Sequence, residues 1–272
     1  MLSTTLKFPY NKLMKFLLLF FLFACSIGRF FIGSLDTYVT SKTADRLQLY
    51  TKQETALGLD IEKLFNQVKP QIKIIEQNLK TLRAKSSLQL EKELVDSSIS
   101  EFVIAYNLGV ELVNKYNQQM TEKQYGLFMK DYKKKLEKKQ KKHNLKRYKK
   151  IVPKKFEDIF GELRKDQTEF LKNNAQVFLN WSKRRFLQED VHYKSLVVAQ
   201  SKADLKERNE LVDKAYKTLQ NSVDEDFKNH LNAVIKVINQ FLQTLNDSQR
   251  SELNEKVDLA LGIMEAFINH RY

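Results

Sequence analysis

Apolar residues recur at steps of three and four along most of the chain, and this spacing limits the fold more than any other feature. A period near 3.6 places such residues on one face of an α-helix, as a stripe that is buried against other helices. The sequence therefore predicts an all-α fold of long antiparallel helices packed in an extended bundle, without a sheet. The clearest stripes are Leu57, Ile61, Leu64, Phe65 and Val68; Ile72, Ile75, Leu79 and Leu82; Phe227, Leu231, Val234, Ile238, Phe241, Leu242 and Leu245; and Val257, Leu261, Met264 and Ile268.

Turn-forming residues are scarce, which argues against a β-sheet protein. The 272 residues include 7 Gly and 3 Pro, and no Asn-Gly pair occurs, whereas hairpins need such turns. One helix is expected from about residue 51, where Pro70 either kinks it or starts a second helix, and Pro153 is expected to mark a break. Further helices are expected over residues 88–117, from 121 into a lysine-rich segment, and over 155–173, 175–200, 204–220, 224–244 and 247–270.

The chain begins with features of an exported protein. Two lysines precede the apolar run 16–25, which is shorter than the roughly 18 residues that a membrane-spanning helix needs. Leu22-Phe23-Ala24-Cys25 resembles a bacterial lipobox, and the resemblance implies cleavage before Cys25, acylation of Cys25 and attachment to a membrane. An uncleaved anchor that continues past Arg29 remains an alternative.

These features divide the chain into a signal peptide at residues 1–24, a lipidated N-terminus and tether at 25–48, and a helical domain at 49–272 with a sub-boundary near 153. Met14 could also serve as the start. Ser26 after the cysteine resembles lipoproteins sent to the outer membrane, so we expect a cell-envelope protein that faces the periplasm. Cys25 is the only cysteine, so the stability of the domain must come from core burial and not from disulfides.

A local pattern recurs four times, with Gln four positions after an apolar residue. Met120–Gln124 and Leu245–Gln249 also carry a capping residue three positions before the Gln, which is the spacing of a capping box. Leu49–Gln53 and Leu163–Gln167 keep the spacing but lack Thr in second place. The simple interpretation is that these are helix starts. Leu-Thr-x-x-Gln pairs also mark the periplasmic chaperones of the Spy and CpxP type, and that resemblance implies chaperone-like binding.

A second resemblance covers most of the chain. Four segments occur in the order found in a family of uncharacterised α-helical bacterial lipoproteins. They are Leu35–Val39, Leu49–Gln53 followed by Val68-Lys69-Pro70, Met120–Gln124, and Lys154–Leu163 leading to Gln167. The resemblance implies a lipoprotein signal and a helical body, and it implies no activity.

The positive charge is concentrated in one segment. Residues 130–155 contain fourteen Lys or Arg and two acids, a net +12, in a chain of net charge +14. Removing three lysines with the signal leaves +11, so the rest of the mature protein is near −1. This is the pattern of a local patch. The candidate residues for binding an anionic surface are Lys133, Lys134, Lys135, Lys138, Lys139, Lys141, Lys142, Lys146, Arg147, Lys149 and Lys150.

Three interpretations of this segment stay open. It can be a long solvated helix, or a contact with anionic envelope material such as lipopolysaccharide or phospholipid head groups. It can also bind nucleic acid, with Tyr132 and Tyr148 stacking on bases, although an exported lipoprotein rarely meets nucleic acid.

Motifs for catalysis are absent from the sequence. The four histidines, His143, His192, His230 and His270, lack helical metal spacing, and no Gly-rich phosphate loop or Gly-x-Ser-x-Gly elbow occurs. We expect no catalytic residues, metal or cofactor. We expect a protein that acts by binding envelope proteins or anionic lipids, in envelope maintenance or as a chaperone. The alternatives are a purely structural helical lipoprotein and a hydrolase whose site is dispersed in the sequence.

Overall fold

A computed structural model of the chain describes residues 35–85, 90–221 and 224–272, and the helices of this part of the chain are connected by short turns. No strand occurs within these ranges, and the predicted all-α fold is confirmed. The predicted signal peptide and Cys25 lie outside the described residues. No helix in the described ranges is long and apolar enough to cross a membrane.

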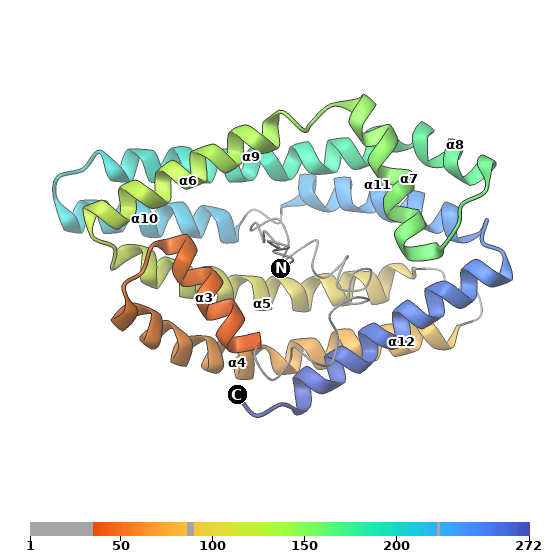
Figure 1. The fold of residues 1–272 in the computed structure, drawn as a ribbon, viewed down its shortest axis with the longest axis horizontal. Coiled ribbons are helices and arrows are strands. Elements are labelled where there is room, and N and C mark those ends of the chain that lie inside the picture. Colours follow the sequence, from red (N-terminus) through yellow and green to blue (C-terminus); the bar gives the residue numbers. More distant parts are fainter. Residues whose placement is uncertain (1–34, 86–89, 222–223) are drawn as a thin grey trace, which may run out of the picture.

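The helices follow one another with few residues between them. They are α3 (Leu35–Leu47), α4 (Thr51–Ala84), α5 (Lys92–Gln118), α6 (Glu122–Gln140), α7 (Leu145–Phe160), α8 (Lys165–Asn173), α9 (Ala175–Gln200), α10 (Leu205–Gln220), α11 (Glu225–Leu242) and α12 (Asp247–Asn269). The described part of the molecule is elongated, with α9, α10 and α11 along one side and α4, α5 and α12 along the other (Figure 1). Helices α3 and α7 run steeply across the long helices, so a single extended antiparallel bundle is not confirmed.

Two hydrophobic cores lie toward opposite ends of the molecule. The first is formed by α3, α4, α5, α6, α9 and α10 and includes the fully buried Leu57 and Leu196. The second is formed by α4, α7, α8, α11 and α12 around Phe241, whose ring lies 4.8 Å from that of Phe156 and 5.1 Å from that of Phe160. The long helix α4 reaches both cores and therefore ties the two ends together.

The chain contains an internal structural repeat. Each half begins with a short helix, α3 or α7, which is followed by a long helical segment, α4 in the first half and α8 with α9 in the second. A second helical segment follows, α5 or α10 with α11, and each half ends with a single helix, α6 or α12. The last helix of each half packs against the long helix of the other, α6 on α9 and α12 on α4. The residues four, eight and twelve positions after the first glutamine of the recurring pattern are buried in both halves. They are Leu57, Ile61 and Phe65 after Gln53, and Leu171, Ala175 and Leu179 after Gln167.

Several expectations differ from the structure. The segment predicted as a tether contains α3, whose Ala44 and Leu47 are buried, so the helical core starts at residue 35 and not at 49. Pro153 does not break a helix but lies inside α7. Of the two alternatives for Pro70, it does not start a second helix but lies inside α4. The carbonyl groups that these prolines leave without a helical N–H belong to the exposed Lys149 and Asn66, where water can bond them.

The helix expected over residues 155–173 is instead two helices, α7 and α8. Gly161 ends α7 with φ of 74°, a conformation that favours glycine, and its N–H donates to the Glu157 carbonyl at 3.0 Å. In the first half, Gln48 follows α3 with φ of 55°. The two halves therefore meet at residues 141–144, between α6 and α7, and not at the expected sub-boundary near 153.

Candidate functional site

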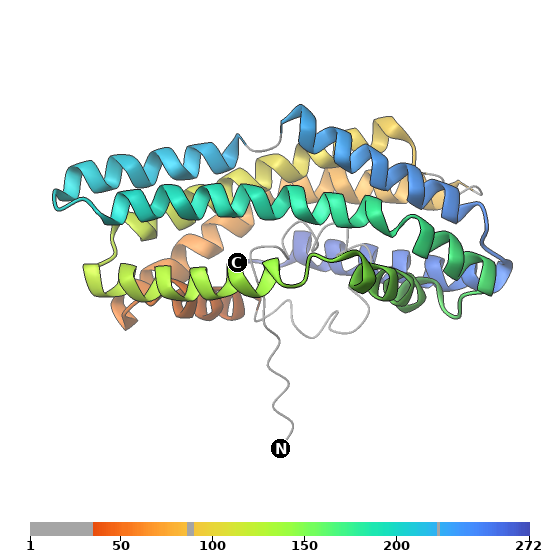
Figure 2. The ribbon, with the colours of Figure 1, turned by 90° about the horizontal axis from the view of Figure 1, so that it is seen from above.

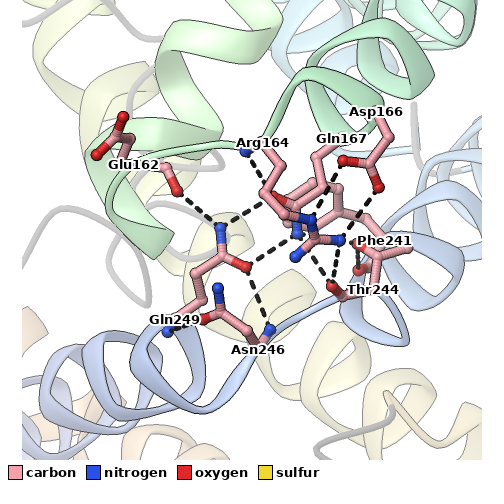
Figure 3. Close-up of polar contacts among 8 residues, drawn as sticks. All are labelled: Glu162, Arg164, Asp166, Gln167, Phe241, Thr244, Asn246 and Gln249. Carbon is pink, nitrogen blue, oxygen red and sulfur yellow. Dashed lines mark hydrogen bonds and ion pairs between the residues drawn. The ribbon is translucent and has the colours of Figure 1, made fainter.

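The four glutamines of the recurring pattern meet in two pairs, one at each end of the molecule. Figure 3 shows the second pair, in which the side chains of Gln167 and Gln249 each donate to the other's Oε1 at 2.9 Å. Gln167 belongs to the first turn of α8 and Gln249 to the first turn of α12. Both are buried, at 1% and 3% exposed. The pairing therefore joins two helix N-termini that are far apart in sequence.

Backbone groups complete the hydrogen bonds of this pair. Gln249 Nε2 donates to the Glu162 carbonyl at 2.8 Å, and Gln167 Nε2 donates to the Thr244 carbonyl at 3.1 Å. The Oε1 atoms accept from the backbone N–H groups of Arg164, at 3.0 Å, and Asn246, at 3.3 Å. The two buried amides thus satisfy one another and bond four backbone groups beside the helix starts.

The first pair repeats the backbone contacts of the second, but only one amide donates to the other. Gln124 Nε2 donates to Gln53 Oε1 at 2.8 Å and to the Gln48 carbonyl at 2.7 Å, and Gln53 Nε2 donates to the Gln119 carbonyl at 3.4 Å. In both pairs each Gln bonds the carbonyl that lies five residues before its partner Gln. The first pair is looser, because Gln53 is half-buried and its bond to Gln119 is long.

Capping explains only part of this arrangement. Thr121 and Asn246 accept from the N–H of their own Gln three residues on, which completes a capping box. At Tyr50 and Arg164 the cap side chain accepts no such bond, and only the Gln reaches back. The glutamine is therefore the common element. The sequence marked each helix start, but nothing in the local spacing predicted which starts would meet.

We call the contact between Gln53 and Gln124 the first junction and that between Gln167 and Gln249 the second junction. An ion pair lies beside the second junction. The Arg164 guanidinium donates to Asp166 Oδ1 and Oδ2 at 3.2 and 3.1 Å and to the Thr244 carbonyl at 3.0 Å (Figure 3). The junctions contain neutral amides at their centre and no nucleophile or general base. Their chemistry is that of a structural joint.

Most of the predicted anionic-surface residues lie on the outside of α6, α7 and the turn between them. Nine of the eleven are exposed, and none of the nine has an acidic group within 4.0 Å among the described residues. We call these nine the basic surface: Lys133, Lys134, Lys138, Lys141, Lys142, Lys146, Arg147, Lys149 and Lys150. Lys135 is half-exposed and pairs with Asp131.

Lys139 does not belong to the exposed surface with which the sequence grouped it. Its side chain is 18% exposed and its ammonium pairs with Glu189 of α9. Burial lowers the pKa of the Lys139 ammonium, and the Glu189 carboxylate opposes that shift. Lys139 follows the buried Leu136 by three residues, a spacing that places both on the inner face of α6.

A buried histidine lies in the same contact between α6 and α9. His192 Nδ1 is 3.1 Å from the Tyr132 hydroxyl, which also donates to the Glu189 carbonyl at 3.2 Å. Burial, and to a lesser extent the nearby Arg46, lowers the pKa of His192 to about 4. The His192 ring is therefore neutral at pH 7, and its role is to fill the first core.

No cluster of three or more His, Cys, Asp or Glu suited to a metal ion occurs in the described part of the chain. His143 Nε2 lies 2.9 Å from Ser182 Oγ. Ser182 is in the middle of α9, where backbone N–H groups are used by the helix, so they cannot form an oxyanion hole.

Comparisons with family models, curated proteins and solved structures found no match to this chain. The geometry described above therefore carries the functional argument by itself.

Proposed function

We propose that this protein is a lipoprotein of the outer membrane that faces the periplasm, is lipidated at Cys25 and acts by binding. Its contact surface is the basic surface on α6 and α7, and its ligand is anionic envelope lipid, recognised through phosphate-bearing head groups. The observation that carries the proposal is the set of nine exposed cations without acidic partners.

The physics favours a surface contact over a pocket. A Lys or Arg near an anionic membrane contributes about 1 kcal/mol, so nine cations on two adjacent helices exceed what a tethered protein needs for stable contact. Elsewhere in the described ranges many lysines pair with acids, such as Lys80 with Glu76 at 2.7 Å and Lys217 with Asp213 at 2.7 Å. Exposed lysines without an acidic partner among the described residues also occur on other helices, such as Lys52 and Lys228, but the basic surface gathers nine such cations within residues 133–150.

The test compares two variants of equal charge in a soluble form that begins at Ser26. The first changes six residues of the basic surface to Gln: Lys133, Lys134, Lys138, Lys141, Lys142 and Lys146. The matched control changes six exposed lysines on other helices to Gln: Lys52, Lys73, Lys165, Lys206, Lys214 and Lys228. Gln is nearly as good a helix former as Lys, so both variants should keep their helix content.

Flotation with vesicles that contain phosphatidylglycerol measures binding. The parent and the control should bind, and the basic-surface variant should lose most of its binding. Binding should also fall steeply from low to physiological salt, because salt screens exposed charges. Equal binding by the two variants, or no binding by the parent, would contradict the proposal. The anchor is tested separately: Cys25→Ala should abolish labelling by radioactive fatty acid in cells.

A further inference from the structure

The outer face of α9 carries a stripe of exposed apolar side chains. Leu187, Val191 and Val198 are 55%, 50% and 53% exposed. Their spacing of four and seven residues places them on one face of the helix, over a length of about 16 Å. Single exposed apolar residues are common on proteins, but several aligned on one face of a helix can mark an interaction surface.

Lysines interrupt the stripe at helical spacing. Lys183 is exposed and precedes Leu187 by four residues, and Lys194 lies between Val191 and Val198. Lys194 pairs with Asp190 at 2.7 Å, so the net positive charge of the stripe comes from Lys183. Lysines beside exposed apolar side chains suit an anionic interface, because the ammonium groups can stay at the head groups while the apolar side chains enter the acyl boundary.

Helix α9, which carries the stripe, packs against both helices of the basic surface. Helix α6 lies alongside α9 in both ribbon views (Figures 1 and 2), joined by Tyr125, whose hydroxyl donates to the Leu196 carbonyl at 2.9 Å. Helix α7 also packs on α9, through Phe156 and Phe178 with ring centroids 5.8 Å apart. The two helices that carry the basic surface therefore lie next to the helix that carries the stripe.

We infer that the α9 stripe enters the head-group region of an anionic bilayer while the basic surface contacts phosphates beside it. This inference rests on the proposed function, because the cations bring α9 to the lipid. Charge complementarity favours lipid over a second copy of this chain. Two copies paired through this stripe would bring lysines together, and like charges repel.

The depth of α9 can be measured in the full, lipidated chain. A Trp181→Phe background removes the only tryptophan, and Leu187→Trp then reports from the stripe. The matched control is Leu59→Trp on α4, a leucine that is 58% exposed and belongs to a helix that does not pack on α9. The proteins are reconstituted in vesicles of brominated phosphatidylcholine, with and without about one third phosphatidylglycerol, since anionic lipid should drive the contact.

Leu187→Trp fluorescence should be quenched about twofold by bromine in the anionic vesicles and Leu59→Trp much less, because an interfacial helix lies only partly within the acyl boundary. Equal quenching at the two positions, or none at Leu187→Trp, overturns the inference. If lipid still shields the basic surface in that case, the proposed function stands without the stripe. If quenching at Leu187→Trp is the same without phosphatidylglycerol, the stripe reaches lipid unaided and the proposed electrostatic contact fails.

A second measurement needs no substitution. Vesicles that contain a photoactivatable acyl chain should form adducts on the wild-type peptide spanning residues 187–198 and not on the α4 peptide around Leu59. Adducts on both peptides, or on neither, contradict the inference. A dimer of the soluble form that is lost in a Leu187→Ser, Val191→Ser, Val198→Ser variant would assign the stripe to a second copy and also overturn it.

Discussion

The two halves of the molecule share a frame and differ in charge. Each half has a pair of glutamines that joins two helix starts, and the last helix of each half packs on the long helix of the other. Yet α6 has seven basic and three acidic residues, whereas its counterpart α12 has two basic and five acidic ones. Likewise α7 has six basic and two acidic residues, and its counterpart α3 has two of each.

This comparison indicates that the glutamine junctions are needed for the fold, whereas the charges on exposed helix faces can vary. The junctions use neutral amides, three of the four buried, so salt and pH should affect them little. Exposed charges contribute little to stability, since most surface ion pairs are worth under about 1 kcal/mol. Opposite charges can therefore occupy equivalent helices without altering the frame, and only one half presents a cationic surface.

The largest expected effect is the loss of a junction glutamine. Gln249→Ala removes four hydrogen bonds. The buried Gln167 loses both of its bonds to this side chain, and the Glu162 carbonyl and the Asn246 N–H lose the partner that Gln249 provides. Unfolding in denaturant should show a loss of about 4 kcal/mol, because each unsatisfied buried group costs about 1–3 kcal/mol. The control Gln77→Ala, at an exposed position of α4, should change stability by less than about 0.5 kcal/mol.

Loss of a glutamine at the first junction should destabilise the protein less than loss of one at the second. Gln53→Ala should cost only about 1–2 kcal/mol, because Gln53 is half-buried and water can replace its long bond to Gln119. A Gln53→Ala loss as large as that of Gln249→Ala would show that the two junctions are equally tight, contrary to their geometry.

Acid should destabilise the first core before the second. The folded pKa of His192 is about 4, below the ordinary value of 6.5, so the unfolded chain binds a proton in that window that the folded chain does not. The stabilisation is fully present above pH 6.5 and is lost as the pH falls toward 4, by up to about 3 kcal/mol. His192 contacts the first core, and no histidine is buried among the described residues of the second.

Hydrogen exchange at pH 5 and pH 7 should therefore show α6, α9 and α10 losing protection before α12. In His192→Gln the stability difference between these pH values should shrink. If the free energy of unfolding of His192→Gln changes between pH 5 and pH 7 as much as that of the parent, other groups cause the acid sensitivity.

The smallest expected effects are at the caps. Thr121→Ala and Asn246→Ala should each cost about 1 kcal/mol, because each removes a side-chain oxygen that accepts from the first turn. Tyr50→Ala should cost almost nothing from capping, because its side chain accepts no such bond. Thermal unfolding of the three variants would compare their losses of stability. Equal losses at all three would contradict the claim that the cap side chain accepts a hydrogen bond at Thr121 and Asn246 but not at Tyr50.

The individual helices were predictable from the sequence, but the contacts between distant helices were not. The spacing of apolar residues predicted α9 at 175–200, as observed, because a helix depends on neighbours three and four residues away. Pairing of Gln167 with Gln249 spans 82 residues, and no local pattern encodes it. Lys139 was assigned to the surface from composition alone, although its spacing from Leu136 placed it on the inner face.

The central claim is that one half of a repeated frame meets anionic lipid, and lysine footprinting tests it directly. The lipidated chain is acetylated briefly in vesicles with and without phosphatidylglycerol, and the modification of each lysine is measured by mass spectrometry. We expect anionic lipid to protect Lys133, Lys134, Lys138, Lys141 and Lys142 of the basic surface. The exposed Lys52 and Lys228, on α4 and α11, should react equally in both vesicles. Uniform protection of all these lysines, or no protection at α6 and α7, would contradict the account.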